Sequence, residues 1–107
     1  KVVYDARGYA LYFSRAPIPD WSRLSASERE QAPRPMKHLG LYVYRRAALE
    51  AFVTMPPSRY ELVEKLEQLR FLEAGYRIRM VEVAHDSIGV DTPEDAAAVS
   101  RLLQEEE

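Results

Sequence analysis

The chain has 107 residues, 47% of them apolar and 30% charged, with a formal net charge of -2 and no cysteine. A chain of this length forms one small domain, and this composition excludes wholesale disorder. The missing cysteines exclude disulfides and thiolate metal sites. The basic residues are scattered, and no apolar run reaches the about 20 residues of a membrane span, so the sequence predicts neither a nucleic-acid partner nor a membrane partner.

The N-terminal segment predicts an antiparallel hairpin. Residues 2–4 are strand formers, and residues 5–8 are a turn signal in which Gly8 can adopt a positive φ. Residues 9–14 then alternate between two faces, as a strand requires. One face is expected to hold Tyr9, Leu11 and Phe13.

Residues 16–37 predict a long connection between elements. Four of the seven prolines lie here, and the middle part, 22–31, suits at most a short helix. Connections of this length are usually functional loops or mobile segments. We assign no functional residue to this loop.

The next segment predicts a strand followed by a helix. Residues 37–45 read "KHLGLYVYR" and alternate as a strand does. Residues 46–55 have a helical pattern that ends at a Pro-Pro pair. One face of the strand holds Leu39, Leu41 and Val43, and the other holds His38, Gly40, Tyr42 and Tyr44.

The C-terminal part predicts two helices around one strand. Ser58 and Glu61 have the spacing of a capping box that opens a helix over 60–75. A strand is expected over 77–84 and a last helix from Pro93 to about residue 103. The order of strands and helices indicates an α/β fold with a mixed sheet. The expected core stripe and C-cap of the first helix are Leu62, Leu66, Leu69 and Gly75.

One carboxylate in "GVDTPED", residues 89–95, is not needed by the helix that follows it. Thr92 is a suitable N-cap and Asp95 supplies the acidic arm of a capping box, which leaves Asp91 outside the cap. Asp91 can simply interact with the positive end of the helix dipole, which would stabilise the helix by about 0.3–1 kcal/mol. It can also be a ligand of a hard cation such as Mg²⁺, which takes one or two carboxylates together with substrate phosphates.

Several polar residues have both a structural and a functional interpretation. His38 and Tyr42 project from one strand face across Gly40, where the glycine either leaves room for a ligand or permits a close backbone approach. Glu67 and Gln68 fit a solvated helix face, and Arg15 fits an exposed strand end. A nucleotide triphosphate needs a cradle of backbone N–H groups or clustered cations, and a chain with four glycines and no glycine-rich loop lacks one.

Four motifs in series resemble one enzyme family. "YALYFSRAPIP", "HLGLYVYR", "EKLEQLRFLEAG" and "GVDTPED" occur in this order, at similar spacing, in 3-deoxy-D-manno-octulosonate cytidylyltransferases, or CMP-Kdo synthetases. The resemblance runs from Val2 to about Leu103 and matches the C-terminal part of that enzyme. The stretches "VAHDSIGVD" and "SRY" depart from the forms found in some members.

The resemblance implies a fold and an activity. The fold would be the C-terminal portion of a nucleotide-diphospho-sugar transferase-like three-layer αβα fold with a mixed sheet. The family transfers CMP from CTP to Kdo, with Mg²⁺ and release of pyrophosphate, for lipopolysaccharide biosynthesis in the cytoplasm, and it forms homodimers. The chain is expected to be a single-domain fragment, 1–107, without the CTP-binding portion, and inactive alone.

The resemblance also implies roles for six residues of the chain. Asp91 would be the metal ligand. The residues that would face the carboxylate and hydroxyls of Kdo are Arg15, His38, Tyr42 and Gln68. Glu67 would lie beside them.

Two other hypotheses stay open. The chain can be a non-catalytic association or scaffold fragment, because the predicted hairpin exposes strand edges. It can also belong to a cytidylyltransferase for another acidic sugar, such as a sialic acid. The combination of "HLGLYVYR" with "LEQLR" favours Kdo.

Overall fold

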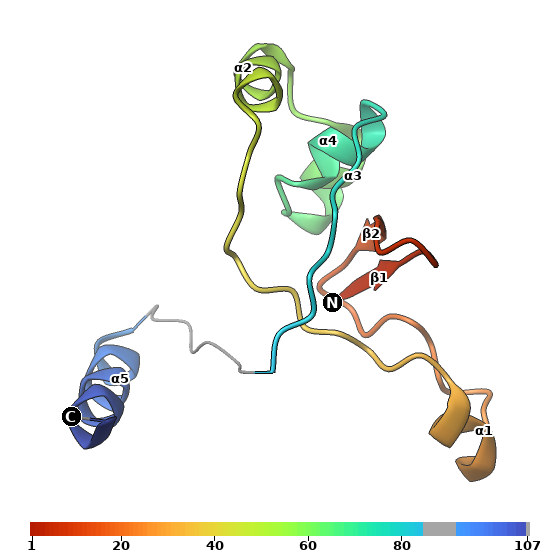
Figure 1. Ribbon diagram of the computed structural model, residues 1–107, viewed down its shortest axis with the longest axis vertical. Helices are drawn as coiled ribbons and strands as arrows, with labels where there is room; N and C mark the ends of the chain where they lie inside the picture. Colours follow the sequence, from red (N-terminus) through yellow and green to blue (C-terminus); the bar gives the residue numbers. More distant parts are fainter. Residues whose placement is uncertain (85–91, 107) are drawn as a thin grey trace.

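The computed structural model describes residues 1–84 and 92–106. Figure 1 shows short strands and helices joined by long extended segments, a combination that agrees with the predicted α/β class. The sheet of the described residues has two antiparallel strands. None of the helices in this part of the chain is long and apolar enough to cross a membrane. The elements are β1 (Val2–Tyr4), β2 (Ala10–Phe13), α1 (Ala26–Gln31), α2 (Arg46–Thr54), α3 (Arg59–Glu64), α4 (Leu69–Glu73) and α5 (Pro93–Glu106).

The predicted hairpin is confirmed, but one of its faces is not as expected. The Asp5 carboxylate closes the turn by accepting two backbone N–H groups, and Gly8 has a φ of 87°. Tyr12 pairs with Val3, whereas Ala10 pairs with Tyr4, so Leu11 is the extra residue of a β-bulge. A bulge shifts the alternation by one residue. Leu11 is therefore 60% exposed, and its predicted place beside the buried Phe13 is wrong.

The predicted strands at 37–45 and 77–84 do not form ladders among the described residues. Each begins beside the hairpin, through one bridge between Met36 and Val2 and another between Arg79 and Tyr9. Beyond these bridges the two segments run as extended chain in Figure 1. A strand needs a neighbour for its N–H and C=O groups, so alternation alone did not make these segments part of a sheet.

The core lies between the hairpin and α4. Val2, Phe13 and Leu69 are buried at 3%, 0% and 1% exposure, and α4 packs on β2. Burying a side chain such as Phe13 contributes roughly 1.5–3 kcal/mol. The partly buried residues around this core are Ala10, Tyr12, Met36, Leu66, Leu72, Ile78 and Met80.

The helix predicted over 60–75 is two helices, α3 and α4. Lys65 ends α3 in the left-handed conformation, with a φ of 59°. The break rotates the second helix relative to the first, so the predicted core stripe is not continuous. Leu69 is buried as expected, but Leu62 is 55% exposed, and its predicted place in the core is wrong.

The predicted helix starts are confirmed, whereas α5 runs to Glu106, beyond its expected end near residue 103. The Glu61 carboxylate accepts the Ser58 backbone N–H at 2.9 Å, which starts α3 at the predicted capping box. Thr92 and Asp95 exchange two side chain to backbone hydrogen bonds at the start of α5, as the sequence indicated. Gly75 follows α4 with a φ of 88°. The predicted helices over 46–55 and after Pro93 are α2 and α5.

Candidate functional site

A cavity of about 120 Å³ lies between the extended segment at 42–44, helix α2 and the start of α4. Its wall combines aromatic rings with a carboxylate and an amide. This mixture of an apolar body and a few polar groups is typical of small-molecule sites. The lining residues are Tyr42, Tyr44, Leu49, Phe52, Glu67, Gln68 and Phe71.

Gln68 is the most unusual polar group of this cavity. It occupies the N-cap position of α4 and is only 8% exposed. Among the described residues, its amide nitrogen Nε2 has no hydrogen-bond partner. A buried donor without a partner costs roughly 1–3 kcal/mol, so this group needs an explanation, and a ligand that accepts its hydrogen bond is one.

His38 and Tyr42 form a hydrogen-bonded pair beside the cavity. The Tyr42 hydroxyl lies 2.5 Å from Nε2 of His38. Burial raises the pKa of Tyr42 to about 12, with help from the negative charge of Glu67, and burial lowers the pKa of His38. Both groups are therefore neutral at pH 7, and whether the phenol or Nε2–H donates depends on the tautomer of the imidazole. In either case the Tyr42 oxygen keeps a lone pair that can accept from a donor on a ligand.

Aromatic rings for which the sequence predicted no role in the site complete the wall. Phe71 is 5% exposed and contacts the rings of Tyr44, Phe52 and Tyr76, with centroids 5.7, 5.0 and 5.8 Å away. The sequence placed Phe71 outside the predicted core stripe. A large apolar residue outside the stripe, followed closely by Tyr76, indicates that the helix contacts neighbours on a second side, and this could have pointed to Phe71.

The space around Gly40 bears on the pair at His38 and Tyr42. A Cβ added to Gly40 would meet no atom within 4 Å among the described residues. A close backbone approach therefore does not explain this glycine in the described part of the chain. The alternative, that the glycine leaves room next to His38 and Tyr42, agrees with the observed space.

The predicted site residues are only partly brought together. Tyr42, Glu67 and Gln68 line one cavity, and His38 is bonded to Tyr42. Arg15 is not among the lining residues, and its guanidinium donates to the carbonyls of Glu64 and Lys65 at 2.9 and 3.0 Å. Asp91 lies outside the described residues. Within the described ranges, no group of three or more His, Cys, Asp or Glu side chains could hold a metal ion.

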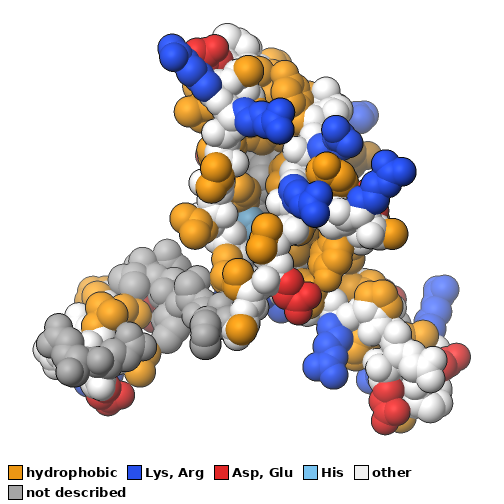
Figure 2. All heavy atoms as spheres, in the orientation of Figure 1, with side chains coloured by type: hydrophobic (Ala, Val, Ile, Leu, Met, Phe, Trp, Pro, Cys, Tyr) orange, Lys and Arg blue, Asp and Glu red, His pale blue; other side chains and the backbone are white. Residues whose placement is uncertain are grey.

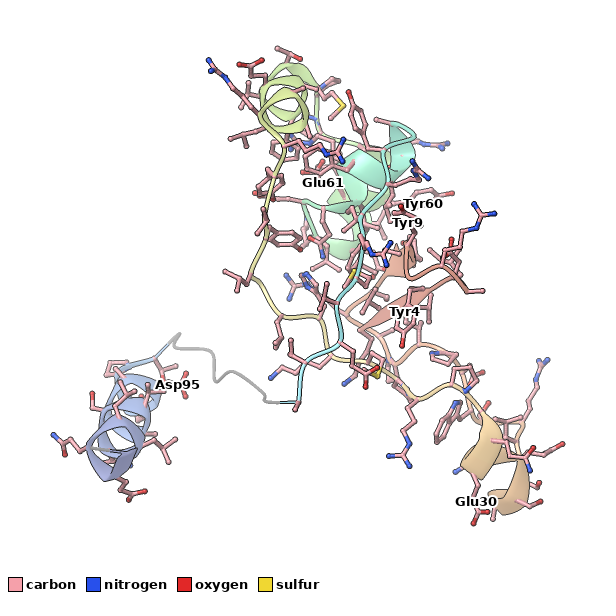
Figure 3. All side chains as sticks on the ribbon, viewed as in Figure 1. Tyr4, Tyr9, Glu30, Tyr60, Glu61 and Asp95 are labelled. Carbon is pink, nitrogen blue, oxygen red and sulfur yellow. The ribbon has the colours of Figure 1, made fainter. Side chains whose placement is uncertain are left out.

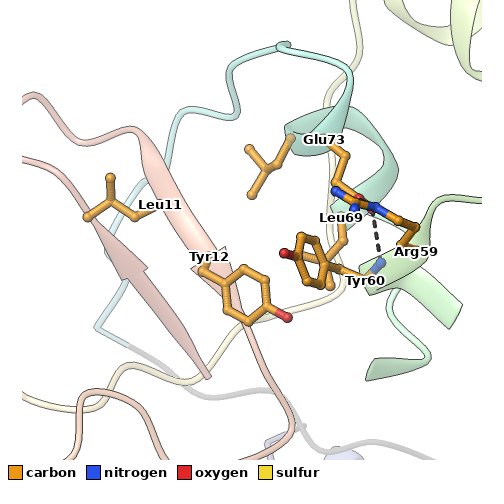
Figure 4. Close-up of a pocket in the computed structure, with 7 residues that line it drawn as sticks. Leu11, Tyr12, Arg59, Tyr60, Leu69 and Glu73 are labelled. Carbon is orange, nitrogen blue, oxygen red and sulfur yellow. Dashed lines mark hydrogen bonds and ion pairs between the residues drawn. The ribbon is translucent and has the colours of Figure 1, made fainter. Parts of the chain in front are cut away.

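A second and larger pocket, of about 310 Å³, opens between β2 and helices α3 and α4 (Figure 4). Arg59 and Glu73 form an ion pair at 3.6 Å on its helical side, and Glu73 also accepts the Tyr60 backbone N–H. The Arg59 guanidinium lies 5.4 Å from the centre of the Tyr60 ring. The two charged side chains of this pocket are thus paired with each other.

Comparison with known proteins identifies the family. A family model described as cytidylyltransferase matches residues 1–79, which include every lining residue of the smaller cavity. The chain belongs to the cytidylyltransferase family. The matched range ends before Asp91.

Individual relatives of this cytidylyltransferase chain have a more specific name. It is 56% identical to a 3-deoxy-manno-octulosonate cytidylyltransferase of Geobacter sulfurreducens, over 97% of this chain and 44% of the relative. The relative of the same name from Syntrophotalea carbinolica is 52% identical, over 97% and 43%. The chain thus spans less than half the length of these relatives.

A solved structure is similar as well. It is the structure of a CMP:2-keto-3-deoxy-manno-octonic acid synthetase complexed with CTP, with a TM-score of 0.86 and 42% identity. The similarity covers 99% of this cytidylyltransferase chain and 42% of the solved one. The arrangement in Figure 1 is therefore one that an experimentally determined cytidylyltransferase also adopts.

Proposed function

We propose that this chain supplies the sugar-acid site of a 3-deoxy-D-manno-octulosonate cytidylyltransferase. The complete reaction transfers CMP from CTP to Kdo and releases pyrophosphate, in the cytoplasm, for lipopolysaccharide biosynthesis. The names of the relatives support the reaction, and the unpaired Gln68 amide in a cavity of mixed polarity is the observation that supports the site. The proposal includes the three-layer αβα fold with a mixed sheet, of which this chain is the C-terminal portion.

The lining residues suit a polyhydroxylated acid. Gln68 offers a buried N–H donor for a carboxylate or hydroxyl oxygen, and Glu67 offers acceptors for hydroxyl groups. Tyr42, held by His38, can accept a hydroxyl hydrogen in a fixed position. Arg15 does not line the cavity, but its guanidinium, bound to the carbonyls of Glu64 and Lys65 at the end of α3, adds a positive charge to this part of the molecule.

The chain's part in the reaction is to bind and orient the sugar. A sugar held at a fixed angle presents its hydroxyl to the α-phosphate of CTP for in-line attack, and such positioning supplies much of the acceleration of nucleotidyl transfer. We propose Asp91 as a ligand of Mg²⁺, since one carboxylate together with substrate phosphates can hold this ion. When bound, Mg²⁺ supplies positive charge that neutralises the phosphates.

We also propose that the functional protein is a homodimer. Several apolar side chains of the extended segments are exposed, among them Leu41 at 89%, Val43 at 100% and Val81 at 76%. Figure 2 shows hydrophobic side chains spread over the same face as a group of Lys and Arg side chains. Sedimentation of the pure chain at micromolar concentration tests this proposal, and a single monomeric species would contradict it.

The function is tested with a chimera. The 107 residues replace the matched region of the Geobacter sulfurreducens enzyme, and pyrophosphate release is measured with CTP, Mg²⁺ and either Kdo or a sialic acid. We expect turnover with Kdo and little with the sialic acid. We expect the isolated chain to give none, because it has no phosphate cradle. Turnover with the sialic acid alone would favour the other acidic sugar, and a folded chimera without turnover would favour the scaffold hypothesis.

Site variants of the chimera then assign the cavity. His38→Ala and Tyr42→Phe are expected to raise the Km for Kdo or lower turnover, and to leave the Km for CTP within a few-fold. A neutral hydrogen bond to substrate contributes about 0.5–1.5 kcal/mol, which corresponds to roughly a two- to tenfold change. Equal losses for both substrates would show that these residues act on folding instead.

A further inference from the structure

Arg70 joins two helices through a buried ion pair. In α4, its Nε and Nη2 donate to Oε1 and Oε2 of Glu61 in α3, at 2.8 and 2.6 Å. The two side chains are only 14% and 8% exposed, and Figure 3 shows Glu61 among α2, α3 and α4. The guanidinium lowers the pKa of the Glu61 carboxyl, so the pair stays charged at pH 7. Two parallel hydrogen bonds fix the plane of the guanidinium as well as its distance.

The third nitrogen of Arg70 reaches helix α2. Nη1 donates to the carbonyls of Phe52 and Met55 at 3.5 and 3.3 Å, and Cζ lies 4.1 Å from the centre of the Phe52 ring. Carbonyls at a helix C-terminus carry partial negative charge, so a cation is favoured there, and the Phe52 carbonyl accepts from Arg70 in addition to the Met55 backbone N–H. Arg70 therefore attaches α2, and with it the Phe52 ring that lines the cavity, to α4.

The backbone of Arg70 holds the opposite wall of the same cavity. Its N–H donates to the carbonyl of Glu67 at 3.0 Å, which closes the turn that presents Glu67 and Gln68. The next residue, Phe71, stacks on Phe52 at 5.0 Å. One residue thus connects both walls, although it does not itself line the cavity.

We infer that Arg70 is a positioning residue for the sugar site, one that fixes the Phe52 wall relative to the unpaired amide of Gln68. The inference rests on the proposed function, because it assigns Arg70 to the geometry of that site. A lysine at this position keeps the positive charge but cannot form the fork with Glu61 and reach the α2 carbonyls at the same time.

A purely structural role makes a different prediction. A buried ion pair broken at one partner destabilises the fold, and any destabilising change would then weaken the site equally. Ile78→Ala provides the matched control. Ile78 packs against the core and is not a lining residue of the cavity, so its truncation lowers stability without touching the Arg70 contacts.

The test compares the unmodified 107-residue chain with Arg70→Lys and Ile78→Ala, at a temperature where all three are folded by circular dichroism. Calorimetric titration gives the Kd for Kdo, and the NMR signal of the Gln68 side-chain amide reports its surroundings without ligand. We expect Arg70→Lys to bind Kdo about tenfold or more weakly and to shift the amide signal, since small displacements of binding groups have large effects. We expect Ile78→Ala to keep the affinity within twofold and the signal unchanged.

Equal affinity losses in the two variants, or unchanged affinity and an unchanged amide signal in Arg70→Lys, would overturn the positioning role. If the unmodified chain binds no Kdo, the proposed function fails separately. The ligand-free amide signal then decides alone: a shift in Arg70→Lys that is absent from Ile78→Ala supports the inference, and its absence overturns it.

Discussion

Two hollows of the described surface, the cavity beside Tyr42 and the pocket between Tyr12 and Tyr60, differ in how their polar groups are paired. In the larger, of about 310 Å³, Arg59 and Glu73 form an ion pair, and Glu73 also accepts the Tyr60 backbone N–H. The smaller, at about 120 Å³, contains the Gln68 amide, which is buried and has no partner among the described residues. In the larger hollow a ligand would have to compete with existing bonds, whereas in the smaller one it would complete a missing bond.

The proposed site therefore rests on the unpaired polar group and not on the volume of the hollow. Folded chains pair nearly all of their buried polar groups, so an unpaired one indicates either a cost that is tolerated or a partner that is absent. Gln68 lines a cavity that is also lined by Tyr42 and Glu67. Their convergence favours a missing polar partner over a tolerated cost.

Among the substitutions that test the difference between the two hollows, Gln68→Met is expected to change stability and Kdo affinity most. Methionine has a similar shape but no donor, so the folded chain loses an unpaired group and its unfolding free energy should rise by about 1 kcal/mol. Affinity for Kdo should fall by roughly 10- to 100-fold, as expected for a lost hydrogen bond to a carboxylate. Thermal unfolding and calorimetric titration measure the two quantities.

The control for this substitution is Gln31→Met on α1, where the side chain is exposed. It should change neither stability nor affinity. A Gln68→Met chain that binds Kdo as well as the unmodified one would show that the unpaired amide has no ligand role.

Lys65→Gly tests the helix break between α3 and α4. A left-handed conformation costs an L-residue about 1–2 kcal/mol, whereas glycine gives up about 0.5–1 kcal/mol in unfolded-state entropy. The unfolding free energy should therefore rise by up to about 1 kcal/mol, with Kdo affinity unchanged. Chemical denaturation measures the change, and Lys65→Ala, which keeps a Cβ, should not increase stability. A loss of stability in Lys65→Gly would contradict the left-handed backbone at this position.

The buried pair beside the smaller cavity should make stability depend on pH. Burial lowers the pKa of His38 below its ordinary value of 6.5, so below that pH the unfolded chain binds more protons than the folded one. Stability from this group is complete above pH 6.5 and is lost as the pH falls through the lowered value. The effect should be smaller than that at Lys65, because His38 is only partly buried.

Thermal unfolding between pH 7.5 and 5.5 measures this dependence. His38→Gln should flatten the curve in this range. The chain has one other histidine, His85, and His85→Gln is the control that should leave the His38 contribution in place. An unchanged slope in His38→Gln would show that the imidazole is not buried against Tyr42.

Arg59→Gln is expected to have the smallest effect, because it alters the larger hollow only. The Arg59 side chain is 86% exposed, and exposed ion pairs contribute little to stability. Kdo affinity should stay within twofold, and the melting temperature should hardly change. A large loss of sugar affinity would move the site to the hollow in Figure 4.

Local features of the fold were predictable from the sequence, and features set by distant contacts were not. The turn at Gly8, the cap at Ser58 and the N-cap at Thr92 follow from residues close in the chain. The bulge at Leu11 and the break at Lys65 could not be predicted in this way, because neither position is a glycine or proline. Alternation at 37–45 predicted a strand, but a strand also needs a neighbour.

The candidate site shows the same division. The sequence paired His38 with Tyr42 and singled out Gln68, which the structure brings to one cavity or its edge. It did not find Phe52 or Arg70, because their roles arise from the packing of α2 against α4, helices whose relative placement no local pattern encodes. Arg15, predicted to face the sugar, has its guanidinium anchored on two carbonyls, which only a contact across the fold could reveal.

The most direct measurement is a crystal structure of the chain grown with Kdo. The account predicts the sugar in the cavity beside Tyr42, with one of its oxygen atoms accepting a hydrogen bond from Nε2 of Gln68 and with the hollow between Tyr12 and Tyr60 empty of sugar. Kdo bound in that other hollow, or bound beside Tyr42 with Gln68 still unpaired, would contradict it.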